Sequence, residues 1–257
     1  MNNASTVDEI ANIFQDQNLS FLDKFTGLTD GTTPTNPPTV LPPADSSNRG
    51  TRFWVGYGHH QGFEGANGQD MILYFSAEQA ANVTVRINGT GYVKNYAVPA
   101  NSVITSETLP KTGVYDARLL LDGKSTKGIS IESDIPIVAY AHIYASTTSE
   151  ASLLLPVGTY GYQYTALTTI QNYASDTYSW AYVVADHDST RIEITPANPT
   201  LSGRPADVPF VVNLNKGEVY QVLGALLAPG SDDGYDMTGT LFRSIPNDNG
   251  RCLPMAV

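Results

Sequence analysis

The sequence predicts an all-β protein built from antiparallel, β-sandwich-like modules in tandem. From residue 51 onward, short segments recur in which every second residue is apolar, and this alternation is typical of half-buried strands. Turn residues follow these segments closely, as at Asn88-Gly89 and Asp122-Gly123. No segment after residue 25 requires a helix. A β-propeller fragment is the alternative architecture, because propeller strands are also short and bounded by glycine.

Residues 1–50 differ from the rest of the chain. Thr6-Val7-Asp8-Glu9 has the form of a capping box, and apolar residues at helical spacing up to Phe14 predict one short amphipathic helix. The stretch from Thr26 to Gly50 is rich in Pro and Thr, which favours an extended linker. We therefore assign residues 1–50 to an N-terminal helix and linker.

Residues 51–150 are assigned to a first β module. Its clearest feature is a hairpin from Val83 to Val98, because an alternating segment leads into the tight-turn dipeptide Asn88-Gly89. The other strands expected here are Arg52–Tyr57, Met71–Phe75, Val103–Ile104, Ala117–Leu121, Gly128–Glu132 and Ile135–Tyr144.

Residues 151–257 are assigned to a second β module of the same style, and a weak internal repeat relates the two. The run that ends at Val257 resembles one that continues further in the first module, so we expect the second module to be truncated at its C-terminus. The strands expected here are Tyr178–Val184, Thr190–Ile194, Phe210–Leu214 and Glu218–Val222, and one strand through Tyr160, Tyr162 and Tyr164.

Composition argues against several classes of function. The 257 residues carry a formal net charge of −11, which disfavours binding to the phosphates of nucleic acid. No apolar run is long enough for a membrane span, and a single cysteine, Cys252, cannot form an internal disulfide framework. The first residues lack the basic and apolar regions of a signal peptide. The oligomeric state is left open.

A glycine-rich loop provides the first candidate ligand-binding residues. His59 and His60 follow Gly-Tyr-Gly and precede a loop that contains Glu64. Loops of this kind often carry binding side chains, so His59, His60 and Glu64 are predicted to form a binding edge. A plain connection between strands is the alternative.

Aromatic side chains provide the second candidate. Tyr160, Tyr162 and Tyr164 are predicted to share one strand face, with Tyr178 and Trp180 close in sequence. Such a group is a candidate platform for sugars or for a protein partner. Packing in the β core is the alternative, since cores use the same residue types.

Catalytic and metal-binding patterns are weaker. Asp186-His187-Asp188 places two carboxylates around an imidazole and is a candidate cation ligand, although a turn-forming role is favoured. His142 is expected to share a half-buried strand face with Tyr140 and Tyr144. The sequence contains no Gly-x-Ser-x-Gly elbow, and its paired carboxylates fall in loops. We therefore predict no catalytic residue, no metal site and no cofactor.

Five segments carry a resemblance to a known family. Through these segments, which occur in the expected order, the chain resembles the N-terminal domain of IgGFc-binding proteins, and more narrowly the members of that family from Bacteroidetes. The segments are GTRFWVGYGHH from Gly50, MILYFS from Met71, KGISIESDIPIVAYAHIY from Lys127, SWAYVVADHDSTRIEITP from Ser179 and LNKGEVYQV from Leu214.

The resemblance covers about residues 50–257 and implies a function. It implies a non-enzymatic module of a larger bacterial protein, secreted or on the cell surface, that serves in adhesion or ligand binding. The implied partner is a host or matrix glycoprotein or glycan. The family offers no residue-level binding motif to place on these positions. A carbohydrate-binding or carbohydrate-active β protein is the alternative function.

Overall fold

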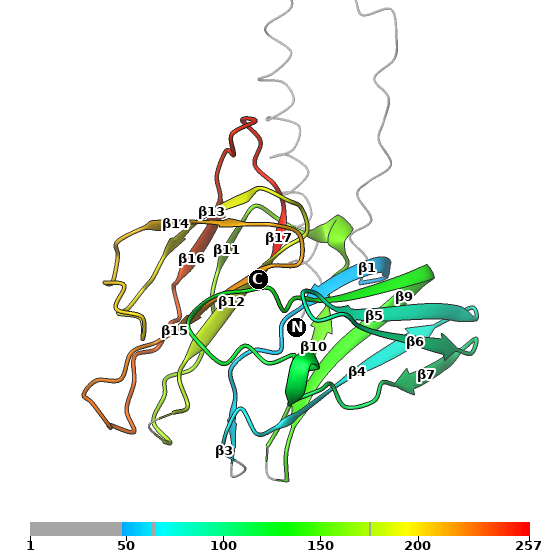
Figure 1. Cartoon of the computed structure of the whole chain (residues 1–257), viewed down its shortest axis with the longest axis horizontal. Coiled ribbons are helices and arrows are strands. Elements are labelled where there is room, and N and C mark those ends of the chain that lie inside the picture. The colour runs from blue at the N-terminus through cyan, green and yellow to red at the C-terminus, as the bar shows by residue number, and fades with distance from the viewer. Residues whose placement is uncertain (1–47, 63–64, 147, 175) are drawn as a thin grey trace, which may run out of the picture. The chain divides into compact units, whose positions relative to one another are not determined.

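Strands dominate the structure, a computed structural model that describes residues 48–62, 65–146, 148–174 and 176–257 (Figure 1). These residues all belong to one compact unit, 43–257. Every paired strand is antiparallel to its neighbour, which confirms the predicted all-β class. The predicted N-terminal helix, most of the linker and Glu64 lie outside the described residues. The module boundary near residue 150 stays a prediction.

The first sandwich is organised around the long strand β9. The N-terminal half of β9 pairs with β1 and β5, and its C-terminal half pairs with β4 and β10. β6 extends one layer beside β5, and β7 extends the other beside β4. The strands are β1 (Gly50–Val55), β4 (Asp70–Ala77), β5 (Ala81–Ile87), β6 (Tyr92–Val98), β7 (Ser102–Thr105), β9 (Ile129–Tyr144) and β10 (Ser149–Leu154).

The two halves of β9 lie in two layers that enclose one core. Phe53 and Ile131 from one layer and Leu73 and Phe75 from the other belong to a single buried cluster. Pro136 lies where β9 changes partners, and a strand that bends from one sheet into the other is a common way to build a sandwich corner.

The second sandwich consists of two four-stranded sheets. Ile192 and Phe242 from one sheet pack with Val183 and Val222 from the other in a second buried cluster. One sheet has the order β11 (Gln163–Thr165), β16 (Leu241–Ser244), β13 (Thr190–Thr195) and β14 (Phe210–Leu214). The other has the order β17 (Met255–Ala256), β12 (Trp180–Ala185), β15 (Val219–Leu223) and β8 (Gly123–Ser125).

Short elements complete the described residues. β2 (Gln61–Gly62) pairs with β3 (Gly65–Ala66), and two 3₁₀ turns occur, η1 (Gly113–Tyr115) and η2 (Val157–Thr159). The sheets face each other in pairs rather than radiating as blades, so the described residues form sandwiches and not the alternative propeller.

The predicted hairpin is confirmed, whereas the strand predicted at Ala117–Leu121 is wrong. β5 and β6 pair from Ala81 opposite Val98, although the turn has four residues. The expected strand Ala117–Leu121 is irregular: Arg118 makes one isolated bridge, and its guanidinium donates hydrogen bonds to the Asn67 carbonyl and the Asp116 carboxylate. Side-chain contacts hold this segment in place of a strand ladder.

A third buried cluster joins the two sandwiches. β1 alternates, so that Phe53 and Val55 enter the first core while Trp54 points the other way, onto Val184 and Val219. Trp54 and the next two alternate positions, Gly56 and Gly58, face the alternate residues Val184, Tyr182 and Trp180 of β12. We call these six residues the interface row.

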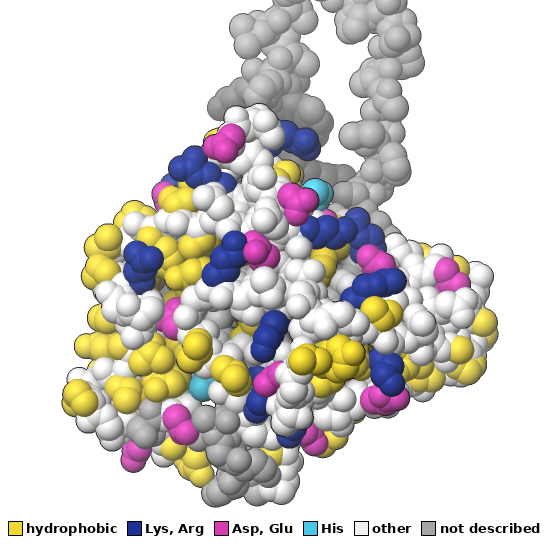
Figure 2. All heavy atoms as spheres, in the orientation of Figure 1, with side chains coloured by type: hydrophobic (Ala, Val, Ile, Leu, Met, Phe, Trp, Pro, Cys, Tyr) yellow, Lys and Arg dark blue, Asp and Glu magenta, His cyan; other side chains and the backbone are white. Residues whose placement is uncertain are grey.

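Charge is distributed rather than concentrated on the visible surface. On the face shown in Figure 2, basic and acidic side chains are interspersed among polar and apolar ones. Within the described ranges, no helix has the length and apolar character to cross a bilayer.

Candidate functional site

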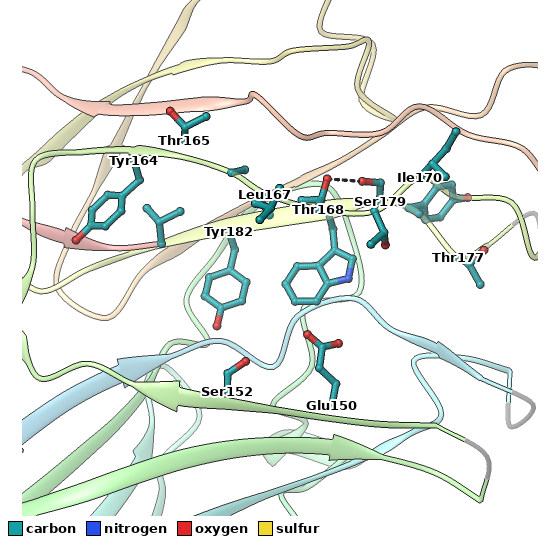
Figure 3. Close-up of a pocket in the computed structure, with 16 residues that line it drawn as sticks. Glu150, Ser152, Tyr164, Thr165, Leu167, Thr168, Ile170, Thr177, Ser179 and Tyr182 are labelled. Atoms are coloured by element: carbon teal, nitrogen blue, oxygen red, sulfur yellow. Dashed lines mark hydrogen bonds between the residues drawn. The ribbon is translucent and has the colours of Figure 1, made fainter. Parts of the chain in front are cut away.

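A concave site, a groove of about 880 Å³, lies between β10 and the second sandwich (Figure 3). One wall carries Glu150 and Ser152 from β10. The other wall is formed by residues 164–170 and 177–182. The volume falls within the range of about 300–1,000 Å³ that is usual for ligand sites.

Two aromatic rings on β12 stand on the wall of the groove that faces β10. Trp180 and Tyr182 are two positions apart, so their side chains point to the same face of the strand. Their ring centroids are 5.7 Å apart, and the ring planes differ by only 9°. Both rings are half-buried. The two rings are therefore stacked in nearly parallel planes.

Two glycines make room for these rings. A Cβ on Gly58 would come within 2.4 Å of the Trp180 ring, and one on Gly56 within 3.1 Å of the Tyr182 ring. Real Cβ atoms do not approach other atoms as closely as the first value. The Gly-Tyr-Gly sequence thus lets Tyr57 fill the first core while the glycines on either side accept the rings of β12.

Glu150 and Ser152 stand on the opposite wall. Figure 3 shows both side chains pointing from β10 towards the wall that carries Tyr182. β10 pairs with β9 through a regular register, in which Ala151 lies opposite His142. Burial raises the pKa of the Tyr182 hydroxyl, and the Glu150 charge raises it further.

A hydrogen-bond network fixes the loop that lines the upper part of the groove. Thr168 donates to an Asp236 carboxylate oxygen at 2.6 Å, and Ser179 donates to Thr168 at 3.0 Å (Figure 3). The hydrogen bond from Thr168 helps to lower the pKa of Asp236 and is its largest cause. The backbone N–H of Met237 donates to Ser179. The loop is thereby tied to β12 and to the segment before β16.

His59 and His60 lie beside the groove. They line a neighbouring hollow of about 300 Å³ that shares Glu150, Tyr178 and Trp180 with the groove, so the two are continuous. Both imidazoles are buried, with 2% and 7% of their surface exposed, and burial lowers the pKa of each. The His59 ring lies 2.7 Å from the Asp176 carbonyl and contacts Tyr178.

The three predicted tyrosines occupy three different environments. Tyr160 packs in the cluster between the sandwiches, where its hydroxyl accepts a hydrogen bond from the Trp54 backbone. Tyr162 is 54% exposed and lies outside the groove. Tyr164 packs against the second core and lines the groove. The expected strand through all three is wrong, because β11 begins only at Gln163.

Of the six predicted ligand-binding residues, the structure brings three to one continuous hollow: His59, His60 and Tyr164. The binding roles of all six stay predictions. Trp180 and Tyr178 were named only as neighbours in sequence, and Tyr182, Glu150 and Ser152 were missed. The alternation of Tyr178, Trp180 and Tyr182 was the signal that could have found the aromatic wall.

The Asp186 triplet has a structural role. The Asp186 carboxylate is fully buried, and one of its oxygens accepts hydrogen bonds from Arg52 at 2.6 Å and from the Trp54 indole at 2.7 Å. Asp188 accepts from the Lys216 backbone N–H, as a turn residue does. Among the described residues, no group of three potential ligands is placed to hold a metal ion.

His142 lies on the half-buried face predicted for it. Its ring contacts Tyr74 and Tyr144, and its two nitrogens lie 3.1 Å from the Tyr74 hydroxyl and 2.8 Å from the Ser149 hydroxyl. These contacts join β4, β9 and β10, so His142 helps to hold the strand that carries Glu150 and Ser152.

Comparison with known families identifies the part of the chain that contains the groove. Residues 150–247 match the family described as IgGFc binding protein. This segment of the chain is therefore similar to IgGFc-binding proteins. All residues of the groove from Glu150 to Tyr182 fall within the matched segment. No curated protein and no solved structure matches the chain.

The match confirms the family resemblance over the second part of the chain. The matched segment includes most of the second sandwich and also nearly all of β10, which belongs to the first. Its N-terminal boundary falls at Glu150 on the groove wall. The groove is therefore lined mostly by the matched segment, and the glycines of residues 56–58 support its aromatic rings.

Proposed function

We propose that this chain is a non-catalytic, extracellular or cell-surface module that serves in adhesion by binding a host or matrix glycoprotein in the groove. The observation that carries the proposal is that the family segment, residues 150–247, supplies both Glu150 and Ser152 on one wall and Trp180 and Tyr182 on the other. A family described by a binding activity supports a binding role for the concave site that its segment builds.

The chemistry of the groove supports binding without catalysis. Hydrolysis of a glycosidic bond uses two carboxyl groups on one cleft. Among the described residues that line this groove, Glu150 supplies the one side-chain carboxylate. The Ser179 hydroxyl donates to Thr168, and the Thr168 hydroxyl donates to Asp236, an arrangement that fixes the loop and includes no histidine base.

A rigid site also supports binding. The aromatic wall rests on backbone at Gly56 and Gly58, and the loop opposite β10 is tied down by side-chain hydrogen bonds. A site that is ordered before the ligand arrives loses less conformational entropy on binding. The groove is therefore suited to hold a partner without rearrangement.

The proposal is tested by surface-immobilised binding measurements. The chain is presented with immunoglobulin G Fc, with purified mucin glycoprotein and with a non-glycosylated serum protein as a negative control. We expect saturable binding to at least one of the two glycoproteins, and loss of that binding in the variant Ser152→Trp, which fills the groove from an exposed position. Equal retention of all three proteins, or of none, contradicts the proposal.

A further inference from the structure

We propose that the groove binds a neutral oligosaccharide, so that the partner is recognised through an uncharged part of its glycan. This inference rests on the proposed function and names the ligand chemistry of the same site. It is carried by three features of the groove: the aromatic pair, the hydroxyl and carboxylate groups opposite it, and the absence of a cationic side chain among the described lining residues.

The aromatic pair has the geometry that a sugar ring requires. A pyranose presents a flat face of C–H groups, and such a face packs against an aromatic ring through dispersion and through the negative charge of the π-face. Trp180 and Tyr182 lie 5.7 Å apart with planes inclined by 9°, and both are partly open to solvent. Two adjacent rings in one orientation can support successive sugar units of one chain.

Polar groups on both walls of the groove complement sugar hydroxyls. More than half of the lining residues carry a hydroxyl group, and a hydroxyl both donates and accepts, as a sugar hydroxyl does. In the described part of the chain, neither the Glu150 carboxylate nor the Trp180 indole N–H takes part in a hydrogen bond. These two groups are thus available to accept from, and donate to, a ligand.

Charge selects against acidic glycans. Neither lysine nor arginine lines the groove within the described residues, and Glu150 is the one charged side chain among them. The adjoining hollow adds only His59 and His60, which are buried and whose pKa values burial lowers. With a net charge of −11 on the chain as well, a sialylated or sulfated oligosaccharide would be repelled.

The walls favour a glycan over a peptide. A peptide that binds as an added strand uses the unpaired backbone of a sheet edge. In this groove Glu150 and Ser152 project from alternate positions of β10, so the ligand meets side chains from one sheet face and aromatic rings from another (Figure 3). A peptide that uses charged anchors would also lack a cationic partner here.

The test is an array of neutral, sialylated and sulfated oligosaccharides, followed by titration calorimetry with the neutral oligosaccharide that binds best. We expect the wild-type chain to retain neutral oligosaccharides and to bind their sialylated forms at least about tenfold more weakly. Trp180→Ala and Ser152→Trp should each lower the affinity at least about tenfold, as removal or blockage of a central contact does. Tyr162→Ala, an exposed tyrosine outside the groove, should leave it unchanged.

Ser152→Trp keeps the test valid if Trp180→Ala fails to fold, since Ser152 is exposed. Absence of neutral oligosaccharide binding, equal binding of sialylated forms, or unchanged affinity in Ser152→Trp overturns the inference. Binding to mucin glycoprotein before and after enzymatic removal of its glycans separates the two proposals. Groove-dependent binding that survives deglycosylation retains the proposed function and overturns the glycan inference, whereas no binding to either form overturns both.

Discussion

The two ends of the interface row, which joins the two sandwiches, differ in which strand carries the large side chain. At one end the large residue is on β1: Trp54 is 8% exposed and packs against the smaller Val184. At the other end the large residue is on β12: Trp180 packs against Gly58 and borders the groove. The same alternation thus produces a closed end that stabilises the pair of sandwiches and an open end that forms a concave site.

The difference teaches how a site is placed without weakening the interface around it. At the closed end, the Trp54 indole and Arg52 both donate to the buried Asp186, which fixes the two sandwiches against each other. At the open end, the rings rest on glycine backbone and keep part of their surface for solvent or ligand. The closed end holds the two sandwiches in a fixed arrangement, and this arrangement positions the rings at the open end.

The largest effect is expected from Asp186→Ala at the closed end. The change leaves the buried Trp54 indole N–H without an acceptor and removes the partner of Arg52, so we expect a loss of about 3 kcal/mol in the free energy of unfolding. Urea denaturation measures it. Asp188→Ala is the matched control, and its exposed turn position should cost less than about 1 kcal/mol. Similar losses of stability in the two variants would contradict the role of Asp186 in fixing the two sandwiches.

A smaller effect is expected from Gly58→Ala at the open end. The new Cβ would lie 2.4 Å from the Trp180 ring, so the ring must move, at a cost of about 1–3 kcal/mol. Ligand affinity should fall with it, because the aromatic wall is displaced. Gly158→Ala, where a Cβ meets open space, should change neither stability nor affinity. Normal affinity in Gly58→Ala would show that the ring position does not matter.

Acidification should destabilise the open end through its buried histidines. Burial lowers the folded-state pKa of His59 and His60 below the ordinary value of 6.5, so the unfolded chain binds more protons as the pH falls through 6.5. Their stabilising contribution is full above about pH 7 and decreases as the pH falls towards their folded-state pKa values. Denaturation curves between pH 7 and 5.5 measure this, and a double variant with asparagine at both positions should show a weaker dependence. An identical pH dependence in that variant would contradict the assignment.

The smallest effect on stability is expected from Glu150→Gln. The side chain is exposed on β10, and the free energy of unfolding should stay within about 0.5 kcal/mol of wild type. Affinity for a neutral oligosaccharide should fall, because an amide is a weaker acceptor than a carboxylate. A change confined to stability would identify Glu150 as a structural residue.

Local patterns predicted much of the fold. The alternation of Val83, Val85 and Ile87 before a glycine turn predicted the hairpin of β5 and β6, and the apolar run from Ile135 predicted the second half of β9. In these segments the same residues decide strand formation and the face that is buried. The segment Ala117–Leu121 has the apolar pattern of a strand but forms no strand ladder, because Arg118 anchors it through side-chain hydrogen bonds to Asn67 and Asp116, which pattern alone does not reveal.

The site depended on contacts between residues far apart in sequence. Gly58 and Trp180 lie far apart in sequence, and only their contact in the folded structure shows that the glycines accommodate the rings. Tyr160 and Tyr164 are equivalent by spacing, yet they pack into different clusters because Tyr160 ends the 3₁₀ turn η2 before β11 begins, whereas Tyr164 lies within β11. The exposure of Tyr162 likewise follows from tertiary packing.

Fluorine NMR of the chain labelled with 5-fluorotryptophan tests the division between the two ends most directly. The chain contains two tryptophans, Trp54 at the closed end and Trp180 at the open end, so two resonances are expected, assigned with Trp180→Phe. Addition of the neutral oligosaccharide that binds best should shift the Trp180 resonance and leave that of Trp54 unchanged. A shift of Trp54 alone, or of neither resonance at a saturating concentration, would contradict the account.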